Sequence, residues 1–364
     1  MAGRYLREVQ RLATSGARGV AAFTVGGVQR LAIPQLAYDA PGSPSGMNGG
    51  DSNTDILLFD RRDGEFAPTG RLPGPGAEDV EYFEVDGTPF LACACIRIGS
   101  GPYNFSVGQP LYRWGGNAWE PFQTIVGHAA KQWRHFTVGG VHHLALAQNR
   151  PGGPELPSRL YRWTGTEFGH LQDIPSRIGY NFHAFDLDGT SYLAHADHLL
   201  PSRLYRWDGA EFVPHQDLMP AGGRAFATFA AGGERYLAVA NIQSDSILLR
   251  WENGRFVDHA VLGGGTGGRE LLVVDTPEGL FMVRVDFITG GPADPHPLLK
   301  SPLYKFEDGT FRVVEEYDTS GGTDVALVAG PGGGRQLVVS HGLNGRLGFE
   351  TESVVYAFSP AGDL

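Results

Sequence analysis

The sequence predicts an all-β fold, a seven-bladed β-propeller that uses the whole chain, residues 1–364, as one domain. Three observations support this prediction. One short phrase returns seven times, each unit contains four strand-like runs, and the two ends of the chain complete one unit between them. A propeller arranges such units radially, so that only short, protected strand edges remain.

The recurring phrase is clearest at Leu160-Tyr161-Arg162-Trp163, which is followed by Phe168 five residues after the tryptophan. Trp163, Trp207 and Trp251 succeed one another at a constant spacing of 44 residues. The other clear copies, written from the first residue to the final aromatic residue, are Leu111 to Trp119, Leu204 to Phe212, Leu248 to Phe256 and Leu303 to Phe311. Degenerate copies occur at residues 57–66 and 355–358, which makes seven units.

Each unit contains four runs with the composition of short strands. In the third unit these are residues 133–138, 144–147, 160–163 and 168–172. Alternation of apolar and polar residues, many β-branched and aromatic side chains, and bounding glycines favour strands of about five residues. We expect the aromatic residues of the third strands to pack between neighbouring blades.

The ends of the chain predict how the ring closes. The last unit stops after Phe358, with no room for its fourth strand. Residues 6–12 match residues 168–174, a fourth strand of the form Phe-x-x-apolar-Gln, position for position. We therefore expect residues 5–12 to complete the last blade.

These features resemble the EPTP, or epilepsy-associated, repeat: the Tyr-Arg-Trp strand, the Phe-x-x-apolar-Gln strand and the spacing of 44 residues. The resemblance covers essentially the whole chain and is weakest in the first, sixth and seventh units, where Leu58, Val274 and Val328 replace aromatic residues. It implies a seven-bladed propeller with a binding role, because the family is best known from secreted neuronal leucine-rich-repeat proteins that bind receptor ectodomains. It implies no catalytic motif.

Long insertions rich in Gly, Pro, Ser and Asn separate the second strand from the third. They span residues 38–54, 97–110, 149–158, 287–301 and 341–353. In a propeller these loops lie on one face, and loops on a rigid scaffold often carry binding residues. We therefore expect a pocket on the long-loop face. The opposite face is predicted to carry only tight turns, such as Asp86-Gly87.

Alignment of the seven units shows three positions where polar residues recur. The end of the second strand carries Gln35, Cys95, Gln148, Asp197, Asn241, Asp286 and His341. The entrance of the innermost strand carries Gly19, Asp79, Gln132, Asn181, Ala225, Glu270 and Asp324. Two residues further along that strand are Ala21, Glu81, Arg134, His183, Ala227, Leu272 and Ala326.

The third position supplies the candidate catalytic residues, because Glu81, Arg134 and His183 fall there in three consecutive blades. We expect His183 to titrate near neutrality as the acid or base, Arg134 to orient an anionic or carbonyl group, and Glu81 to hold the arginine or act as a second base. A structural polar cluster around channel water is the competing interpretation. The predicted ligand-binding residues around this group are Asp79, Asn181, His195, Asp197, Asp286 and His341.

Composition limits the possible partners. The net charge of −11 disfavours nucleic acid or an anionic membrane as partner. Nearly all cationic residues are arginine, a skew that favours a GC-rich bacterial genome. Cys93 and Cys95, two apart on one strand, have poor geometry for a disulfide, and the first residues lack the apolar core of a signal peptide. We therefore expect a reduced, cytoplasmic protein.

The sequence predicts no cofactor and no metal. The glycine run at residues 263–268 joins two strands and lacks the lysine of a phosphate-binding loop. Asp294 and His296 are too few ligands for a metal site. The main functional hypothesis is a small-molecule-binding propeller, acting as a cofactor-independent enzyme of the cyclase, isomerase or lyase type in bacterial metabolism. The alternative is an interaction module that docks a protein on the same face.

Overall fold

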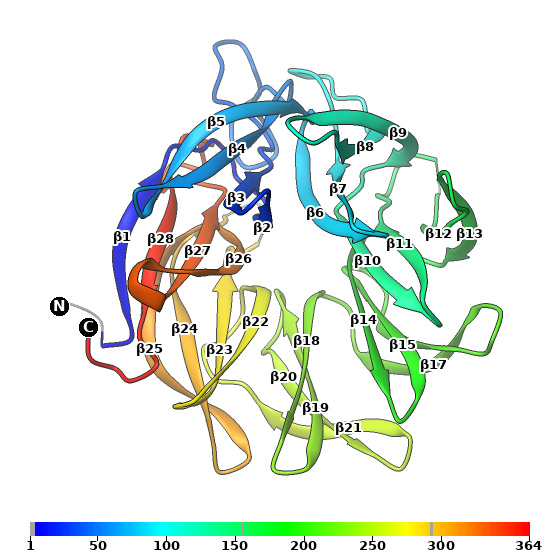
Figure 1. The fold of residues 1–364 in the computed structure, drawn as a ribbon, viewed down its shortest axis with the longest axis vertical. Helices are drawn as coiled ribbons and strands as arrows, with labels where there is room; N and C mark the ends of the chain where they lie inside the picture. Colours follow the sequence, from blue (N-terminus) through cyan, green and yellow to red (C-terminus); the bar gives the residue numbers. More distant parts are fainter. Residues whose placement is uncertain (1–3, 155, 292–293) are drawn as a thin grey trace.

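The computed structural model describes residues 4–154, 156–291 and 294–364, and it forms a ring of seven four-stranded antiparallel sheets (Figure 1). The predicted seven-bladed propeller is therefore confirmed. Within each blade the strands lie in chain order from the axis outward, except in the last blade, where the N-terminal strand is outermost.

The strand bounds follow the predicted units. Blades one and two are β2 (Ala21–Val25), β3 (Val28–Ile33), β4 (Asp55–Arg62), β5 (Glu65–Pro73) and β6 (Ala77–Val85), β7 (Thr88–Cys95), β8 (Ser106–Trp114), β9 (Trp119–His128). Blades three and four are β10 (Gln132–Val138), β11 (Val141–Ala147), β12 (Ser158–Trp163), β13 (Phe168–Ile174) and β14 (Gly179–Leu187), β15 (Thr190–Asp197), β16 (Ser202–Trp207), β17 (Phe212–Met219). Blades five and six are β18 (Gly223–Ala231), β19 (Glu234–Asn241), β20 (Ile247–Glu252), β21 (Arg255–Val261) and β22 (Gly268–Thr276), β23 (Gly279–Asp286), β24 (Leu298–Glu307), β25 (Thr310–Ser320). Blade seven is β26 (Gly322–Ala329), β27 (Arg335–His341), β28 (Ser353–Phe358) and β1 (Leu6–Leu12), with the short 3-10 helix η1 (Pro331–Gly333) between β26 and β27.

The N-terminal strand closes the ring as predicted. β1 pairs with β28 in antiparallel register, from Leu6 opposite Phe358 to Leu12 opposite Ser353. Figure 1 shows the blue first strand beside the red last strand, with both chain ends at the same edge. The two chain ends thus share one sheet, and β28 keeps no free edge.

A glutamine in the fourth strands joins neighbouring blades. The Gln172 amide donates to the backbone carbonyl of Phe212 (2.8 Å) and accepts from its N–H (2.9 Å), so it replaces both partners of a ladder position. Equivalent pairs of hydrogen bonds run from Gln10 to Phe66, Gln123 to Phe168 and Gln216 to Phe256. We call these four glutamines the amide clasps. They explain why the repeat retains glutamine at this position.

Aromatic side chains pack between blades, as expected. The Trp163 ring lies 6.2 Å from Phe90 and 6.0 Å from Phe122, centroid to centroid, and both partners belong to blade two. Tyr161 of the same strand is buried against Trp133, at 5.7 Å. The tryptophan itself is only half-buried, so the tyrosine contributes more of the closed core.

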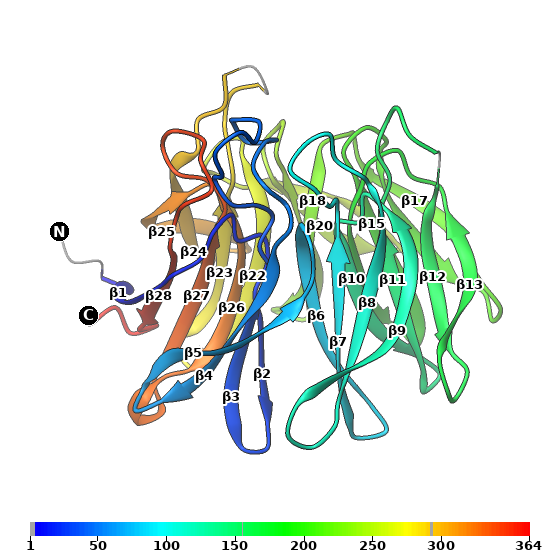
Figure 2. The same ribbon diagram turned by 90° about the horizontal axis from the view of Figure 1, so that it is seen from above.

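The two faces of the ring differ sharply, as Figure 2 shows. The long loops between second and third strands lie on one face, and the tight turns on the other. Asp86 and Gly87 both have positive φ (49° and 76°), the geometry of a two-residue hairpin turn. On the long-loop face, loops from five blades share one apolar cluster, which we call the loop cluster: Leu36, Ala37, Phe287, Ile288, Leu343 and Phe349, with Met47, Ile96 and Ile242 at its edge.

Candidate functional site

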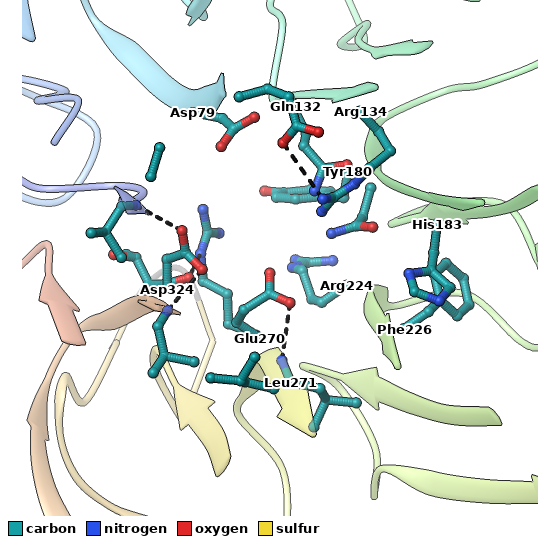
Figure 3. Close-up of a pocket in the computed structure, with 18 of the residues that line it drawn as sticks. Asp79, Gln132, Arg134, Tyr180, His183, Arg224, Phe226, Glu270, Leu271 and Asp324 are labelled. Carbon is teal, nitrogen blue, oxygen red and sulfur yellow. Dashed lines mark hydrogen bonds and ion pairs between the residues drawn. The ribbon is translucent and has the colours of Figure 1, made fainter. Parts of the chain in front are cut away.

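The axis of the propeller contains a cavity of about 450 Å³. All residues that line it lie on the seven innermost strands or directly before them. Figure 3 shows charged and amide side chains pointing into it from every side, including Asp79, Arg134, Arg224 and Glu270. The cavity is thus a polar site built on rigid strands rather than on loops.

A layer of basic residues forms one end of this cavity. We call it the cation layer; each blade contributes one residue, in the order Arg18, Glu78, Lys131, Tyr180, Arg224, Arg269 and Thr323. Four of these side chains are cationic and one is anionic. Each stands directly before an entrance position that the sequence alignment identified, yet the alignment overlooked the layer itself.

The strand entrances explain why two consecutive residues face the axis. In blades two, four, six and seven the pairing register of the innermost strand shifts at this point, for example between Gly179 and Asn181. Such a bulge inserts one extra residue and redirects its side chain. Tyr180 is that residue in blade four, and its ring lies 3.8 Å from the Arg224 guanidinium carbon. Strict two-residue alternation cannot reveal such a position.

Two arginines of the cation layer have unpaired nitrogens. Among the described residues, the Nε atoms of Arg18 and Arg224 find no hydrogen-bond partner, although these residues are only 7% and 5% exposed. The nearest carboxylate oxygen to Arg18 Nε is Glu78 Oε1, at 4.0 Å. Burial lowers the pKa of each of these two arginines to about 10. Buried donors are normally paired, so these two nitrogens are exceptions. The other nitrogens of Arg224 have partners: Nη1 donates to the carbonyls of Gly222 and Gly223, and Nη2 lies 3.0 Å from His198 Nδ1.

Glu78 is the only carboxylate in this layer. Its Oε2 atom accepts a hydrogen bond from Arg269, at 3.0 Å. Burial alone would raise the pKa of Glu78, but Arg18 and Arg269 outweigh burial and lower it. Glu78 is therefore ionised, and the layer keeps an excess of positive charge.

The next layer along the axis carries three carboxyl groups, Asp79, Glu270 and Asp324, which we call the carboxyl layer. Burial is the main cause of the raised pKa of all three, and their mutual repulsion adds to it for Asp79 and Glu270. The pKa rises to about 8 for Glu270 and to about 6 for Asp324. At neutral pH Glu270 is therefore largely protonated.

Two members of the carboxyl layer also have a structural role. Asp79 Oδ2 accepts from the Trp133 backbone N–H at 2.9 Å, and Asp324 Oδ2 accepts from Val20 N–H at 2.7 Å, each across a blade boundary. Glu270 differs, because its Oε1 atom accepts only from Leu271 N–H of its own strand, at 3.0 Å. Glu270 is thus the carboxyl group in this layer that the fold needs least.

The predicted catalytic group is only partly assembled. Arg134 Nη1 lies 3.5 Å from Glu81 Oε2, so the expected pairing is present. The negative charge of Glu81 raises the pKa of the Arg134 guanidinium, which therefore stays positively charged. Burial raises the pKa of Glu81, although Arg134 opposes the shift. Figure 3 shows His183 beside Phe226 at the side of the cavity. Its Nε2 atom lies 3.0 Å from the Thr228 hydroxyl of the next blade.

The expectation that His183 titrates near neutrality is wrong. Burial, with a smaller contribution from Arg134, lowers its pKa to about 3, so the imidazole is neutral at physiological pH. Of the residues predicted to surround it, Asp79 and Asn181 line the cavity. Their roles in binding stay predictions.

Four other predicted ligand-binding residues do not line the cavity. Asp197 accepts hydrogen bonds from the backbone N–H groups of Leu199 and Leu200 (2.8 and 2.9 Å) and so shapes its own loop. His195 is buried, its ring stacks on Phe182 of its own blade at 4.4 Å, and its Nε2 atom lies 3.3 Å from Ser158 Oγ of blade three. The expectation that these two residues face the cavity is wrong.

Asp286 and His341 also lie outside the cavity, because each is bonded to neighbouring parts of its own blade. Asp286 forms a buried ion pair with Arg284 at 2.7 Å. His341 Nδ1 contacts the Glu352 carbonyl at 3.0 Å, and burial lowers the pKa of its imidazole to about 4. The ends of the second strands lie one layer outside the axis, so their polar residues organise loops instead of the cavity.

The accessible end of the cavity is on the tight-turn face. The side chain of Arg18 is 6% exposed, that of Glu81 16% and that of Arg134 36%, so exposure rises away from the long loops. At the other end the Phe287 ring of the loop cluster lies 5.0 Å from the Arg18 guanidinium carbon and 5.2 Å from that of Arg269. The axial cavity therefore opens away from the long loops, and the predicted pocket on the long-loop face stays a prediction.

Potential metal ligands are dispersed. Within residues 4–154, 156–291 and 294–364, no group of three or more His, Cys, Asp or Glu side chains is arranged to hold a metal ion. Asp294 and His296 form an exposed pair at 3.6 Å. Cys93 and Cys95 are buried, free thiols. Across those same ranges no helix is long and apolar enough to span a bilayer.

Comparisons with known proteins agree with the repeat and the fold. The EPTP domain model matches residues 119–164 and 211–252. The thrombospondin-type laminin G domain and EAR repeat-containing protein of Mus musculus is 30% identical over 123 residues, which are 33% of this chain and 17% of the relative. Its Homo sapiens counterpart is 33% identical over 99 residues, 26% of this chain and 15% of the relative. The chain therefore matches less than one fifth of the length of these relatives.

A solved structure supports the architecture. BBS1N, in a crystal structure of its complex with ARL6DN, superimposes with a TM-score of 0.61 at 10% identity and covers 100% of both chains. At this identity the likeness shows the fold alone. With the matches of the repeat, it leads to one conclusion: this chain is a seven-bladed propeller that carries EPTP, or epilepsy-associated, repeats.

Proposed function

We propose that this propeller is a binding module whose central cavity takes a small ligand with a carboxylate or phosphate group. The single observation that carries the proposal is the excess of positive charge in the cation layer, where four basic side chains line the cavity with only one carboxylate, Glu78. An arginine presents a planar set of donors that matches carboxylate and phosphate oxygens. The ligand enters from the tight-turn face and its anionic group reaches the cation layer.

Catalysis is not part of this proposal. The acid/base role expected for His183 requires an imidazole that exchanges a proton near neutrality, and burial lowers the pKa of this imidazole to about 3. Arg134 and Glu81 remain available at the accessible end, where they form an ion pair.

The proposal is tested by titration calorimetry with phosphate, succinate and glutamate as probes. We expect at least one probe to bind, and Arg18→Gln and Arg224→Gln to weaken it by about tenfold or more, as loss of a charge-assisted hydrogen bond does. Arg250→Gln is the matched control, because Arg250 pairs with Glu252 on an outer strand. If no probe binds wild type, or all three variants bind alike, the proposal fails.

A second function, docking of a partner protein, is favoured by the family and by the loop cluster, which supplies a preformed face from five blades. The test is a photo-crosslinking residue placed at Leu199 on the long-loop face or at Leu327 near the tight turns, both of which are exposed. Docking on the long-loop face predicts adducts with another protein from position 199 alone. Equal adducts from both positions contradict it.

A further inference from the structure

The cavity presents opposite charges in two successive layers. The cation layer holds Arg18, Lys131, Arg224 and Arg269 with only one carboxylate, whereas the carboxyl layer holds Asp79, Glu270 and Asp324 with no basic residue of its own. Consecutive residues of the chain supply the two layers, and their Cα atoms are about 3.8 Å apart. Basic and carboxyl side chains therefore lie in adjacent layers, over a distance comparable with the size of a small molecule.

The carboxyl layer lacks a cationic partner. Asp79 and Asp324 accept only backbone N–H groups, and Glu270 accepts only Leu271 N–H. None of the three forms an ion pair with a described residue; Arg134, the basic residue on their open side, is paired with Glu81. The cation layer one step deeper has the opposite imbalance, because its four basic residues share one carboxylate, Glu78.

From this geometry we propose that the ligand is a compact zwitterion, whose carboxylate or phosphate binds the cation layer and whose ammonium group lies in the carboxyl layer, against Glu270. The inference rests on the proposed function and names the ligand class of that same cavity. An ammonium group donates a hydrogen bond to a single carboxyl group without needing further ligands, and the other carboxyl groups of the layer favour its positive charge. A metal ion suits them less, since no three described ligands converge.

The protonation state of Glu270 also favours a ligand with an ammonium group. Burial first, then Asp324, raises the pKa of Glu270 to about 8, so the free protein holds a proton there at pH 7. The groups that face Glu270 across the cavity are Asp324 of β26, Asp79 of β6, Arg134 of β10, Arg224 of β18, Tyr180 of β14 and Arg269 of its own strand. An ammonium group placed among the carboxyl groups favours their ionised forms. Binding should therefore release a proton, and affinity should rise between about pH 6 and pH 8.

The test compares matched probes that differ only in the amine: L-glutamate with glutarate, and L-alanine with propionate. We expect the amino acid of the better-binding pair to bind about tenfold more tightly than its partner at pH 7. Titrations in buffers of different ionisation enthalpy should show proton release with the amino acid and none with the amine-free acid.

Variants assign the effect to the carboxyl layer. Glu270→Gln keeps the side-chain shape and should reduce the amino-acid preference to about threefold or less, while binding of glutarate or propionate persists. Glu84→Gln, which removes an exposed carboxylate at the far end of β6, is the matched control and should retain the full preference. Asp324→Asn supplies a second carboxyl variant, and its fold is checked by its melting temperature because Asp324 also joins two blades.

The outcomes separate the two proposals. If no anion binds, or if Arg18→Gln binds as wild type does, the proposed function has failed. If the anions bind at the cation layer but the amine adds nothing, or if Glu270→Gln retains the full preference, the zwitterion inference is overturned and the proposed function stands.

Discussion

Polar side chains on the outer strands of this propeller and those at its axis differ in how completely they are hydrogen-bonded. On the fourth strands, Gln172 and the other amide clasps form two hydrogen bonds each to the neighbouring blade. At the axis, Arg18 and Arg224 are buried without a partner for Nε among the described residues. The first group is the same residue in four blades, and the second changes from blade to blade.

The difference separates structural from functional polarity. A repeated glutamine with both amide atoms satisfied stabilises the ring, because an unsatisfied backbone group at the same place would cost free energy. A buried arginine nitrogen without a partner costs free energy in the empty protein, and our proposal assigns the arginines at the axis to ligand binding. Satisfaction of hydrogen bonds, rather than burial alone, distinguishes the two regions.

Removal of residues 1–12 should have the largest effect on the structural region. β28 would lose its partner and Phe66 would lose the clasp of Gln10, so an open strand edge would remain. We expect the melting temperature to fall by more than about 10 °C, or association of the chains. A truncated protein that stays monomeric and melts with the full-length chain would show that the ring does not depend on this closure.

Loss of one amide clasp should have the next largest effect. Gln172→Ala leaves the N–H and carbonyl of Phe212 without their partner, which should destabilise the fold by about 2 kcal/mol in denaturant titrations. The control, Gln243→Ala, removes an exposed glutamine from the β19–β20 loop and should change stability by less than about 0.5 kcal/mol. Equal stability of the two variants would mean that the clasps are incidental.

The stability that Glu270 contributes at the axis should depend on pH. Its pKa is raised from 4.5 to about 8, so the folded state binds this proton more strongly than the unfolded state. The resulting stability is present at low pH and is lost as the pH rises from about 4.5 through about 8. The melting temperature of wild type minus that of Glu270→Gln should therefore increase by about 3 °C or more when the pH falls from 8 to 5.

The difference in melting temperature between wild type and Glu270→Gln reports on the Glu270 carboxyl group alone. Histidines such as His183, whose lowered pKa acts in the opposite direction, are common to both proteins and cancel. A difference in melting temperature that does not change with pH would show that the Glu270 carboxyl has an ordinary pKa.

Removal of an unpaired arginine should have the smallest effect on stability. Arg18→Gln takes away a buried charge that lies 4.0 Å from its nearest carboxylate oxygen, so little favourable energy is lost. We expect the free energy of unfolding to change by less than about 1 kcal/mol in the absence of ligand. A loss as large as that of Gln172→Ala would place Arg18 among the structural residues.

The sequence predicted the fold more completely than the site. The phrase around Trp163 and the match of residues 6–12 to a fourth strand sufficed for seven blades and their closure. They sufficed because every blade repeats the same packing. The pairing of Glu81 with Arg134 was predicted for the same reason, since the two residues occupy one position in adjacent blades.

The cation layer was not predicted from the sequence, because it depends on β-bulges and because its residues differ from blade to blade. A register shift brings Tyr180 to the axis beside Asn181, where regular alternation would turn it away. A usable signal did exist: a basic residue stands directly before the entrance position in four units, at Arg18, Lys131, Arg224 and Arg269. The misplaced wall residues, such as Asp197, show that recurrence of polarity marks loop organisation as readily as a site.

The most direct measurement is calorimetric titration of glutamate into wild type, the double variant Arg18→Gln/Arg224→Gln and Gln172→Ala, with the melting temperature of each protein recorded. Our account predicts that the double variant stays folded and binds about 100-fold more weakly, because two charge-assisted contacts are lost. It predicts that Gln172→Ala loses stability and keeps its affinity. A double variant that binds glutamate with wild-type affinity would contradict the account.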